Sequence, residues 1–461
     1  MHRDDEDIVE LFVDSEDIDD LDASDLDEDL DEGFDPAEDD EQGQLTFSLD
    51  DDADEEEDTI SAALAPGTPL VLFQRSHQHS TYLPTVISDG IHKHSGRVSI
   101  GVVAPLPRMT PEGIRRFFSK VEHVPVRIAD PEAFARLDSF GDTLSVQRGG
   151  KPYIGPSTSK HWSYITDELP LGGTSAWVEQ VVETQRSVGA SVILTPGVWA
   201  DSADSIRSLN TIRQHARWTH EACDEDEKVI VNITAPSSWL STPSLRDRLL
   251  DELVDMDDNT FYLRLRWPLL AQPYGQPLDA KILDGYAEIC NVLDENDKAL
   301  ILPNTGITGW VALAWGAHGF STGVGTGERA FADTRVIRIK NRPRREPTRR
   351  TFVTPILHVT DVPTADRFNA LPEVEECHCK FCRALRELPR GQFNKDLAGG
   401  HYLKNALDLT AEVTRHARGR RVAARQIVRD ARGLVEAAKD RVPLVDNNNP
   451  RHLQLWSDRL R

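Results

Sequence analysis

The chain has 461 residues, more than one ordinary domain needs, and a formal net charge of −25. That charge is uneven, because residues 1–58 hold 30 acidic residues and one arginine, whereas the remaining chain has 47 acidic and 51 basic residues. The chain has no apolar run long enough to span a bilayer, its N-terminus is the opposite of a signal peptide, and its cysteines are few. These features exclude a membrane-embedded protein and predict a cytoplasmic one.

The acidic N-terminal segment, placed at residues 1–62, is expected to be a disordered tail, because it has few aromatic residues and a strong negative charge. Two interpretations stay open. The tail is either a solvating arm or an acidic mimic that occupies a basic surface of the body or of a protein partner.

After the tail, short apolar runs alternate with amphipathic helical runs. Strands are predicted at 70–73, 98–103, 124–128, 191–194, 229–233, 261–265, 299–302 and 319–322. Helices are predicted near 111–121, 174–188, 203–217, 243–256, 278–295 and 307–317. This alternation predicts parallel strands that are buried on both faces. Eight such units favour a closed (β/α)₈ TIM barrel at 63–334 over an open doubly wound sheet.

The C-terminal ends of barrel strands are where reacting groups belong. Asp130 is the one carboxylate placed directly at a predicted strand end, although it could equally cap the next helix, because Pro131 follows it. Arg266, followed by Trp267, would suit contact with a phosphate and a stacked base. The alternative for this pair is packing combined with a surface ion pair.

Two loops after the last predicted strands suggest phosphate recognition. Asn304 and Thr305 follow the seventh strand, and Gly323 and Gly325 belong to a glycine-rich run after the eighth. Barrels often bind phosphate in these loops, where glycine lets backbone N–H groups approach an anion. The alternative is a tight turn. The phosphate could belong to a nucleic acid or to a small ligand.

A basic strip follows the predicted barrel. Residues 335–350 contain eight arginines and lysines and one acid, and their centre is Arg342, Arg344 and Arg345. The strip is either a solvated linker or a contact with a phosphate backbone, because arginine binds phosphate in a bidentate manner. We assign 335–403 to this strip and a metal-binding subdomain. The segment 404–461 is assigned to C-terminal helices, with a basic helical stretch at about 418–440.

Three cysteines within six residues suit a tetrahedral metal better than a disulfide. The predicted ligands of a structural Zn²⁺ are Cys377, Cys379, Cys382 and His401. His378 and His416 are weaker candidates for the fourth position. The pair Gly399 and Gly400 is expected to let the chain turn before His401 begins a helix.

A barrel followed by Cys-X-Cys-X-X-Cys and a histidine at the head of a helix resembles the tRNA-guanine transglycosylase family. The resemblance implies a (β/α)₈ barrel with a zinc subdomain and exchange of a purine base in tRNA, or in DNA for some relatives. It also implies one Asp as nucleophile and another as general acid/base. Asp138-Ser139-Phe140 opens like the family's Asp-Ser-Gly-Gly-Phe motif but continues in a different order. Where the family has Phe-Asp-Cys, this chain has Phe320-Ser321, so the nucleophile position departs from the pattern.

The leading hypothesis is therefore a transglycosylase-like protein that exchanges a base of the 7-deazaguanine type, with Asp130 and Asp138 as candidate catalytic residues. One alternative is a catalytically inactive relative that still binds nucleic acid. Another is a barrel enzyme that acts on a phosphorylated small molecule. Expected partners are tRNA or DNA, and a homodimer stays open.

Overall fold

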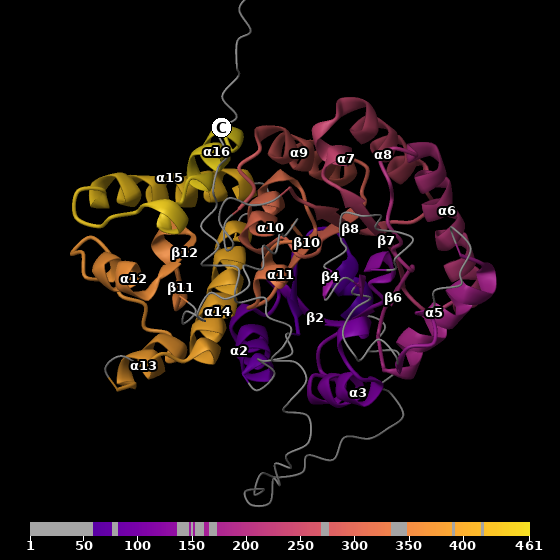
Figure 1. The fold of residues 1–461 in the computed structure, drawn as a ribbon, viewed down its shortest axis with the longest axis horizontal. Helices are drawn as coiled ribbons and strands as arrows, with labels where there is room; N and C mark the ends of the chain where they lie inside the picture. Colours follow the sequence, from indigo (N-terminus) through magenta and orange to yellow (C-terminus); the bar gives the residue numbers. More distant parts are fainter. Residues whose placement is uncertain are drawn as a thin grey trace, which may run out of the picture.

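A computed structural model of the chain describes residues 59–75, 82–135, 147–148, 151–152, 161–165, 173–268, 276–332, 348–389, 392–415 and 419–461. In this part of the chain a ring of parallel strands is surrounded by helices, and a smaller C-terminal unit packs on one side of the ring (Figure 1).

Eight parallel strands form the central sheet. They are β1 (Leu70–Gln74), β2 (Ser99–Pro105), β3 (Val126–Asp130), β6 (Ile193–Leu194), β7 (Val229–Pro236), β8 (Thr260–Arg266), β9 (Ala299–Leu302) and β10 (Gly319–Thr322). Each barrel strand pairs with the next one in sequence except β3 with β6, and β10 pairs with β1. The seam between β3 and β6 is closed by one parallel bridge, Ile128 to Val192, and by a hydrogen bond from the Ser191 N–H to the Arg127 carbonyl (3.0 Å). The result is a nearly closed (β/α)₈-type barrel. A short hairpin, β4 (Gln147–Arg148) with β5 (Lys151–Pro152), stands apart from it.

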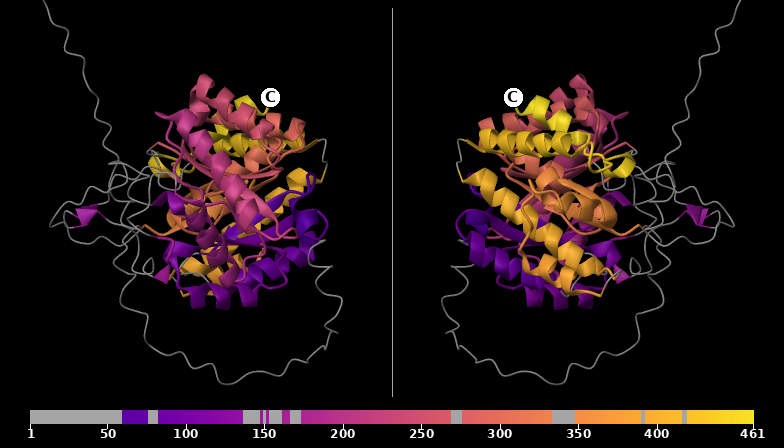
Figure 2. Two further views of the ribbon diagram at one scale, coloured as in Figure 1. Left: turned by 90° about the vertical axis from the view of Figure 1, so that its right-hand side faces the viewer. Right: turned by 90° about the vertical axis from the view of Figure 1, so that its left-hand side faces the viewer.

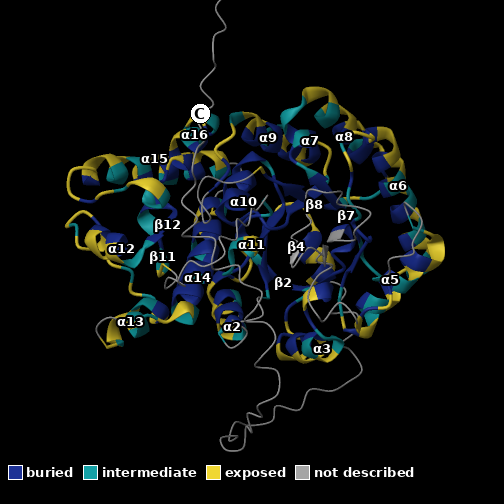
Figure 3. Ribbon diagram, viewed as in Figure 1, coloured by how far each residue is buried: buried dark blue, intermediate teal, exposed yellow. Residues whose placement is uncertain are grey.

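All eight predicted strands are confirmed to within three residues at either end, and those at 299–302 and 319–322 agree at both ends. They could be recognised because strands covered on both faces need apolar residues at nearly every position. Figure 3 shows this pattern, with the barrel strands buried and the exposed residues on the surrounding helices and loops. The predicted tight alternation of strand and helix therefore corresponds to the barrel architecture.

The N-terminal end of the barrel is filled by the first described residues. Residues 59–64 are helical, and Ile60, Ala63 and Leu64 pack with residues from the barrel interior, such as Leu70. Nε2 of the buried His318 lies 3.0 Å from the Ala63 carbonyl oxygen. The folded body therefore begins slightly before residue 63, where the sequence analysis placed its boundary.

Helices surround the barrel. They are α2 (Leu83–His94), α3 (Pro111–Lys120), α5 (Ser175–Ser187), α6 (Ser205–Ala222), α7 (Ser238–Ser241), α8 (Pro243–Asp255), α9 (Ala280–Glu295), α10 (Gly306–Ala312) and α11 (Thr326–Arg329). The six predicted helices are confirmed, whereas α2 and the two short helices α7 and α11 were not predicted. One reason that the helices could be predicted is that some begin with a recognisable capping residue. At the start of α3, for example, the Thr110 hydroxyl accepts the Gly113 N–H (3.1 Å).

The C-terminal unit combines a small sheet with helices. Its elements are β11 (Arg350–Val353), β12 (His358–Asp361), α12 (Val362–Asn369), α13 (Lys380–Glu387), α14 (Lys395–Thr414), α15 (Arg420–Ala438) and α16 (His452–Arg459). The strands β11 and β12 are antiparallel. Val353, Phe368 and Ala438 belong to a small hydrophobic core of this unit.

Helix α14 joins this unit to the barrel. It contacts α13 and β11 on one side and α2, α10 and β1 on the other. The side views show α14 and α15 lying across this flank of the barrel (Figure 2). In the part of the chain that the structure describes, no helix is long and apolar enough to cross a membrane.

Candidate metal centre and barrel mouth

The four predicted metal ligands come together. Nδ1 of His401 lies 3.8 Å from Sγ of Cys377, 3.5 Å from Sγ of Cys379 and 3.0 Å from Sγ of Cys382. All four donor atoms lie within 4.8 Å of one another, and none of the five cysteines forms a disulfide. Around a tetrahedral zinc ion, bond lengths of about 2.3 Å to sulfur and 2.0–2.1 Å to nitrogen separate these atoms by about 3.6 Å. The cluster could therefore bind a metal ion, and its donor set is one that zinc favours.

Two elements position these ligands. Cys379 is the N-cap of α13, where its Sγ accepts the Cys382 N–H (3.3 Å), so the helix start holds two ligands together. His401 lies inside α14, and its Nε2 lies 2.9 Å from the Phe352 carbonyl oxygen of β11. Donation to this carbonyl directs Nδ1 towards the three thiols, as metal-binding histidines usually arrange, although the Asn405 amide nitrogen also lies 3.0 Å from Nδ1. His378 is exposed and takes no part in the cluster, and His416 lies outside the described residues.

The cluster shifts the pKa values of its ligands in different directions, because hydrogen bonds with Cys377 and Cys379 raise the pKa of the Cys382 thiol. Hydrogen bonds with Cys379 and Cys382 hold the pKa of the Cys377 thiol well below its usual range. Burial lowers the pKa of His401, but hydrogen bonds with Cys377 and Cys379 outweigh it and raise this pKa to about 9. A metal ion binds only the deprotonated forms, so it must displace the proton from His401.

The prediction for Gly399 and Gly400 is wrong, because neither makes a turn. Both lie in the interior of α14, which begins at Lys395, so His401 does not open the helix either. A Cβ at Gly400 would lie 2.5 Å from the Phe381 ring, and one at Gly399 would lie 2.8 Å from a Val324 methyl group. The two glycines therefore permit close packing, one against the metal-binding turn and one against the loop after β10.

The barrel mouth, at the C-terminal ends of the strands, contains a buried ion pair. The Arg264 guanidinium donates through Nη2 to Asp130 Oδ2, and both side chains are 1% exposed. Oδ1 of Asp130 also accepts the Glu132 N–H (3.0 Å). Asp130 therefore caps the turn after β3 and neutralises a buried cation. It does not cap a helix that begins at Pro131, because the next helical turn is a 3-10 helix that begins at Ala133.

A hydrogen-bond network extends from this ion pair across the mouth. Nε of Arg264 donates to Asn304 Oδ1 (2.9 Å), whose Nδ2 donates to Gln74 Oε1 (3.0 Å). The Ser321 hydroxyl accepts the Asn304 N–H (2.8 Å) and Gln74 Nε2 (3.1 Å). Strands β1, β3, β8, β9 and β10 are linked in this way. Asn304 therefore supports the barrel mouth, and its side chain does not face outward to a phosphate.

The glycine-rich loop after β10 already holds an anionic group. Oε2 of Glu328 accepts the Gly325 N–H (2.8 Å), and a Cβ at Gly323 would lie 2.1 Å from the same carboxylate oxygen. The Thr305 hydroxyl donates to the Leu302 carbonyl (2.8 Å) and is buried. The Gly325 N–H that was expected to contact phosphate is therefore bonded to Glu328, and Thr305 is used within its own turn.

The other predicted contacts have mixed outcomes. Strand alternation places Arg266 on the inner face of the barrel, where it is 7% exposed. Trp267 is fully buried and donates to the Tyr286 hydroxyl (2.9 Å), so it cannot stack on a ligand. The predicted residues Asp138, Arg342, Arg344 and Arg345 lie outside the described residues.

One residue connects the metal centre to the barrel mouth. Tyr402, next to His401, has its hydroxyl 2.6 Å from the Thr322 hydroxyl at the end of β10. Its ring also lies under the Arg329 guanidinium, 3.7 Å from ring centre to Cζ. Sequence patterns gave no indication of Arg329, whereas Arg264 could have been suspected as a charge within the apolar β8 run.

Comparison with known proteins does not identify a family for this chain. No protein-family model matches the chain, and no curated protein matches it. The functional argument therefore depends on the residues themselves.

Proposed function

We propose that the protein is a tRNA-guanine transglycosylase-like protein that binds tRNA or DNA at the barrel mouth and exchanges a base there. The observation that carries the proposal is the direct link between the metal centre and the mouth, through the Tyr402–Thr322 contact. In this proposal a structural Zn²⁺ is held by Cys377, Cys379 and Cys382 together with His401. Bound zinc would supply folding free energy to the C-terminal unit.

Asp130 is the proposed reacting carboxylate of the mouth. Base exchange at a sugar carbon needs a carboxylate that can attack the carbon or transfer a proton. Asp130 lies at the end of β3 and forms an ion pair with Arg264. Arg264 would act as a positioning residue, because its other hydrogen bonds, to Asn304 and Thr234, fix its orientation.

A second candidate function is nucleic-acid binding without base exchange. Both oxygens of Asp130 are engaged, one by Arg264 and one by the Glu132 N–H. Ser321, at the position of the family's nucleophile, is fully buried and accepts two hydrogen bonds. A neutral hydroxyl held in this way is a poor nucleophile without an activating base. These contacts favour a relative in which binding persists and exchange is lost.

Incorporation of labelled guanine or 7-deazaguanine into tRNA and DNA distinguishes the two candidates. Under the first candidate the wild type incorporates label, Asp130→Asn does not, and Asp430→Asn on the exposed surface of α15 behaves as wild type. Binding of tRNA or DNA with a steep salt dependence but without incorporation would favour the second candidate. Absence of both binding and incorporation would reject both candidates in favour of a barrel enzyme for a phosphorylated small molecule.

A further inference from the structure

A pocket lies where the barrel meets the C-terminal unit. Its volume is about 120 Å³, and its walls come from the loop after β10, from β11 and β12, and from the start of α14. Val324 and Gly325 contribute on the barrel side, and Phe352, Phe393 and Ala398 contribute on the other. The pocket therefore exists only when the two parts are packed together.

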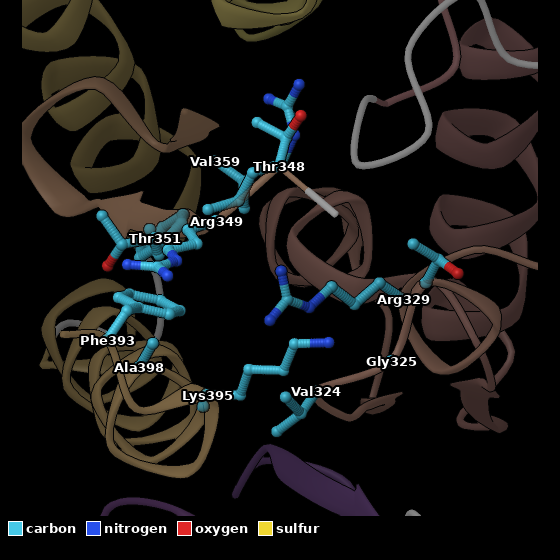
Figure 4. Close-up of a pocket in the computed structure, with 14 residues that line it drawn as sticks. Val324, Gly325, Arg329, Thr348, Arg349, Thr351, Val359, Phe393, Lys395 and Ala398 are labelled. Atoms are coloured by element: carbon cyan, nitrogen blue, oxygen red, sulfur yellow. The ribbon is translucent and has the colours of Figure 1, made fainter. Parts of the chain in front are cut away.

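Cationic side chains dominate this pocket. Arg329, Arg349, Arg350 and Lys395 line it, and none of the fourteen lining residues is acidic. Figure 4 shows Arg329 and Lys395 extending into the same space from opposite sides. Glu328 lies next to the pocket, where its carboxylate accepts the Gly325 N–H. Cationic side chains that converge on one space attract an anion.

The Arg329 side chain is held in place. It is 9% exposed, its Nε donates to the Gly323 carbonyl (3.0 Å), and its guanidinium stacks on Tyr402. A guanidinium fixed in this way is prepared for bidentate contact with a phosphate oxygen pair.

The placement of Lys395 is unfavourable for the helix that carries it. Lys395 is the first residue of α14, whose N-terminus is capped by the Asn394 side chain through the N–H groups of Asp396 (2.9 Å) and Leu397 (3.0 Å). The N-terminus of a helix carries partial positive charge, so a lysine there opposes the helix dipole. The same position adds a further attraction for an anion in the pocket.

We propose that this pocket is a phosphate-binding site, formed jointly by the barrel and the metal-binding unit. Arg329 and Lys395 provide the central contacts, and Arg349 and Arg350 supply charge from the end of the basic strip. The phosphate comes from a nucleic-acid backbone or from a small phosphorylated ligand, and the first source rests on the function proposed above. The pocket depends on the metal centre, because Ala398, His401 and Tyr402 lie on one stretch of α14.

Calorimetric titration of the full-length protein with pyrophosphate, at constant ionic strength, tests the site. Lys395→Gln should weaken binding about tenfold, as expected for the loss of one hydrogen bond to a charged group. Lys439→Gln removes the same charge from an exposed position at the end of α15, away from the pocket, and should bind as wild type. Saturating pyrophosphate should raise the thermal midpoint of the wild type more than that of Lys395→Gln, whereas a purely structural lysine would leave the two increases equal. Absence of saturable binding by the wild type, or equal affinity of Lys395→Gln and wild type, overturns the proposal.

A labelled single-stranded oligonucleotide then identifies the source of the phosphate. If the backbone is the ligand, pyrophosphate displaces the oligonucleotide, and Lys395→Gln weakens both ligands and reduces the salt slope by about 0.7. If Lys395→Gln weakens pyrophosphate alone, the site is confirmed for a small phosphorylated ligand and the nucleic-acid source is rejected. Neither measurement uses base exchange, so failure of the enzyme proposal would leave these results unchanged.

Discussion

The ion pair between Asp130 and Arg264 allows a quantitative test of the barrel mouth. Asp130→Asn preserves the shape of the side chain but removes the charge opposite Arg264. Both side chains are 1% exposed, so water cannot replace the lost partner. Removing one partner of a buried ion pair typically costs about 3–5 kcal/mol. We expect about 3 kcal/mol, because Arg264 keeps its hydrogen bonds to Asn304 and Thr234.

Urea denaturation followed by tryptophan fluorescence measures this cost. Glu112→Gln is a matched control, because it removes one carboxylate from an exposed helical ion pair with Arg116. Such surface pairs contribute about 0.5 kcal/mol or less. In the double variant Asp130→Asn with Arg264→Met, the total cost should be smaller than the sum of the single costs, because no unpaired charge remains buried.

The result also bears on catalysis. If Asp130→Asn costs no more than Glu112→Gln, the ion pair does not stabilise the mouth, and the reasoning above is refuted. Loss of base exchange together with unchanged stability would instead identify Asp130 as a reacting group. Additive costs in the double variant would show that the two side chains do not depend on each other.

Four further predictions concern the metal centre, two glycines in helices, the buried His358 and the acidic N-terminal segment. Metal analysis should find one zinc per chain in the wild type, and Cys382→Ser should lose it and unfold the C-terminal unit, as followed by limited proteolysis; a zinc-free, folded wild type would contradict this. Gly400→Ala should lower the free energy of unfolding by about 1–3 kcal/mol, because its Cβ would collide with the Phe381 ring. The control Gly433→Ala, in an uncrowded position of α15, should raise it by about 0.5–1 kcal/mol, and equal effects of the two variants would refute the packing argument. Burial lowers the pKa of His358 to about 4 from about 6.5 when unfolded, so the unfolded state binds more protons between these values. Stability should be complete above about pH 6.5 and fall towards pH 4, and His358→Gln should flatten this part of the curve in urea titrations. Deletion of residues 1–58 should leave the thermal midpoint unchanged and strengthen oligonucleotide binding at low salt, because 30 acidic residues are removed; equal affinities would count against an acidic competitor.

The barrel could be predicted from the sequence because its signals are local. Each of the eight strands is a short apolar run, as burial on both faces requires, and each predicted helix has an amphipathic pattern or a cap. Part of the metal site could also be predicted from local sequence, because Cys377, Cys379 and Cys382 are so close in the chain that their thiols must lie near one another. Only His401 had to be brought in from a distance, and its place within α14 was misjudged.

The interactions at the site depended on tertiary structure. Asp130 and Arg264 are 134 positions apart, and no local pattern reports that they form an ion pair. Asn304 and Gly325 were taken for phosphate contacts because their local patterns suit a phosphate loop. In the folded chain, the Asn304 side chain is already hydrogen-bonded to Arg264 of another strand, and the Gly325 N–H is already bonded to Glu328 of the next turn.

The sequence by itself determined the barrel, the positions of its strands and the three-cysteine cluster, because these follow from hydrophobic periodicity and from short covalent spacing. The tertiary structure decided how Gly399 and Gly400 are used, which polar groups at the mouth are already bonded, and that Arg329 and Lys395 face one pocket. Packing brings residues from distant segments within a few ångströms of one another, and hydrogen bonding and charge act only at such distances.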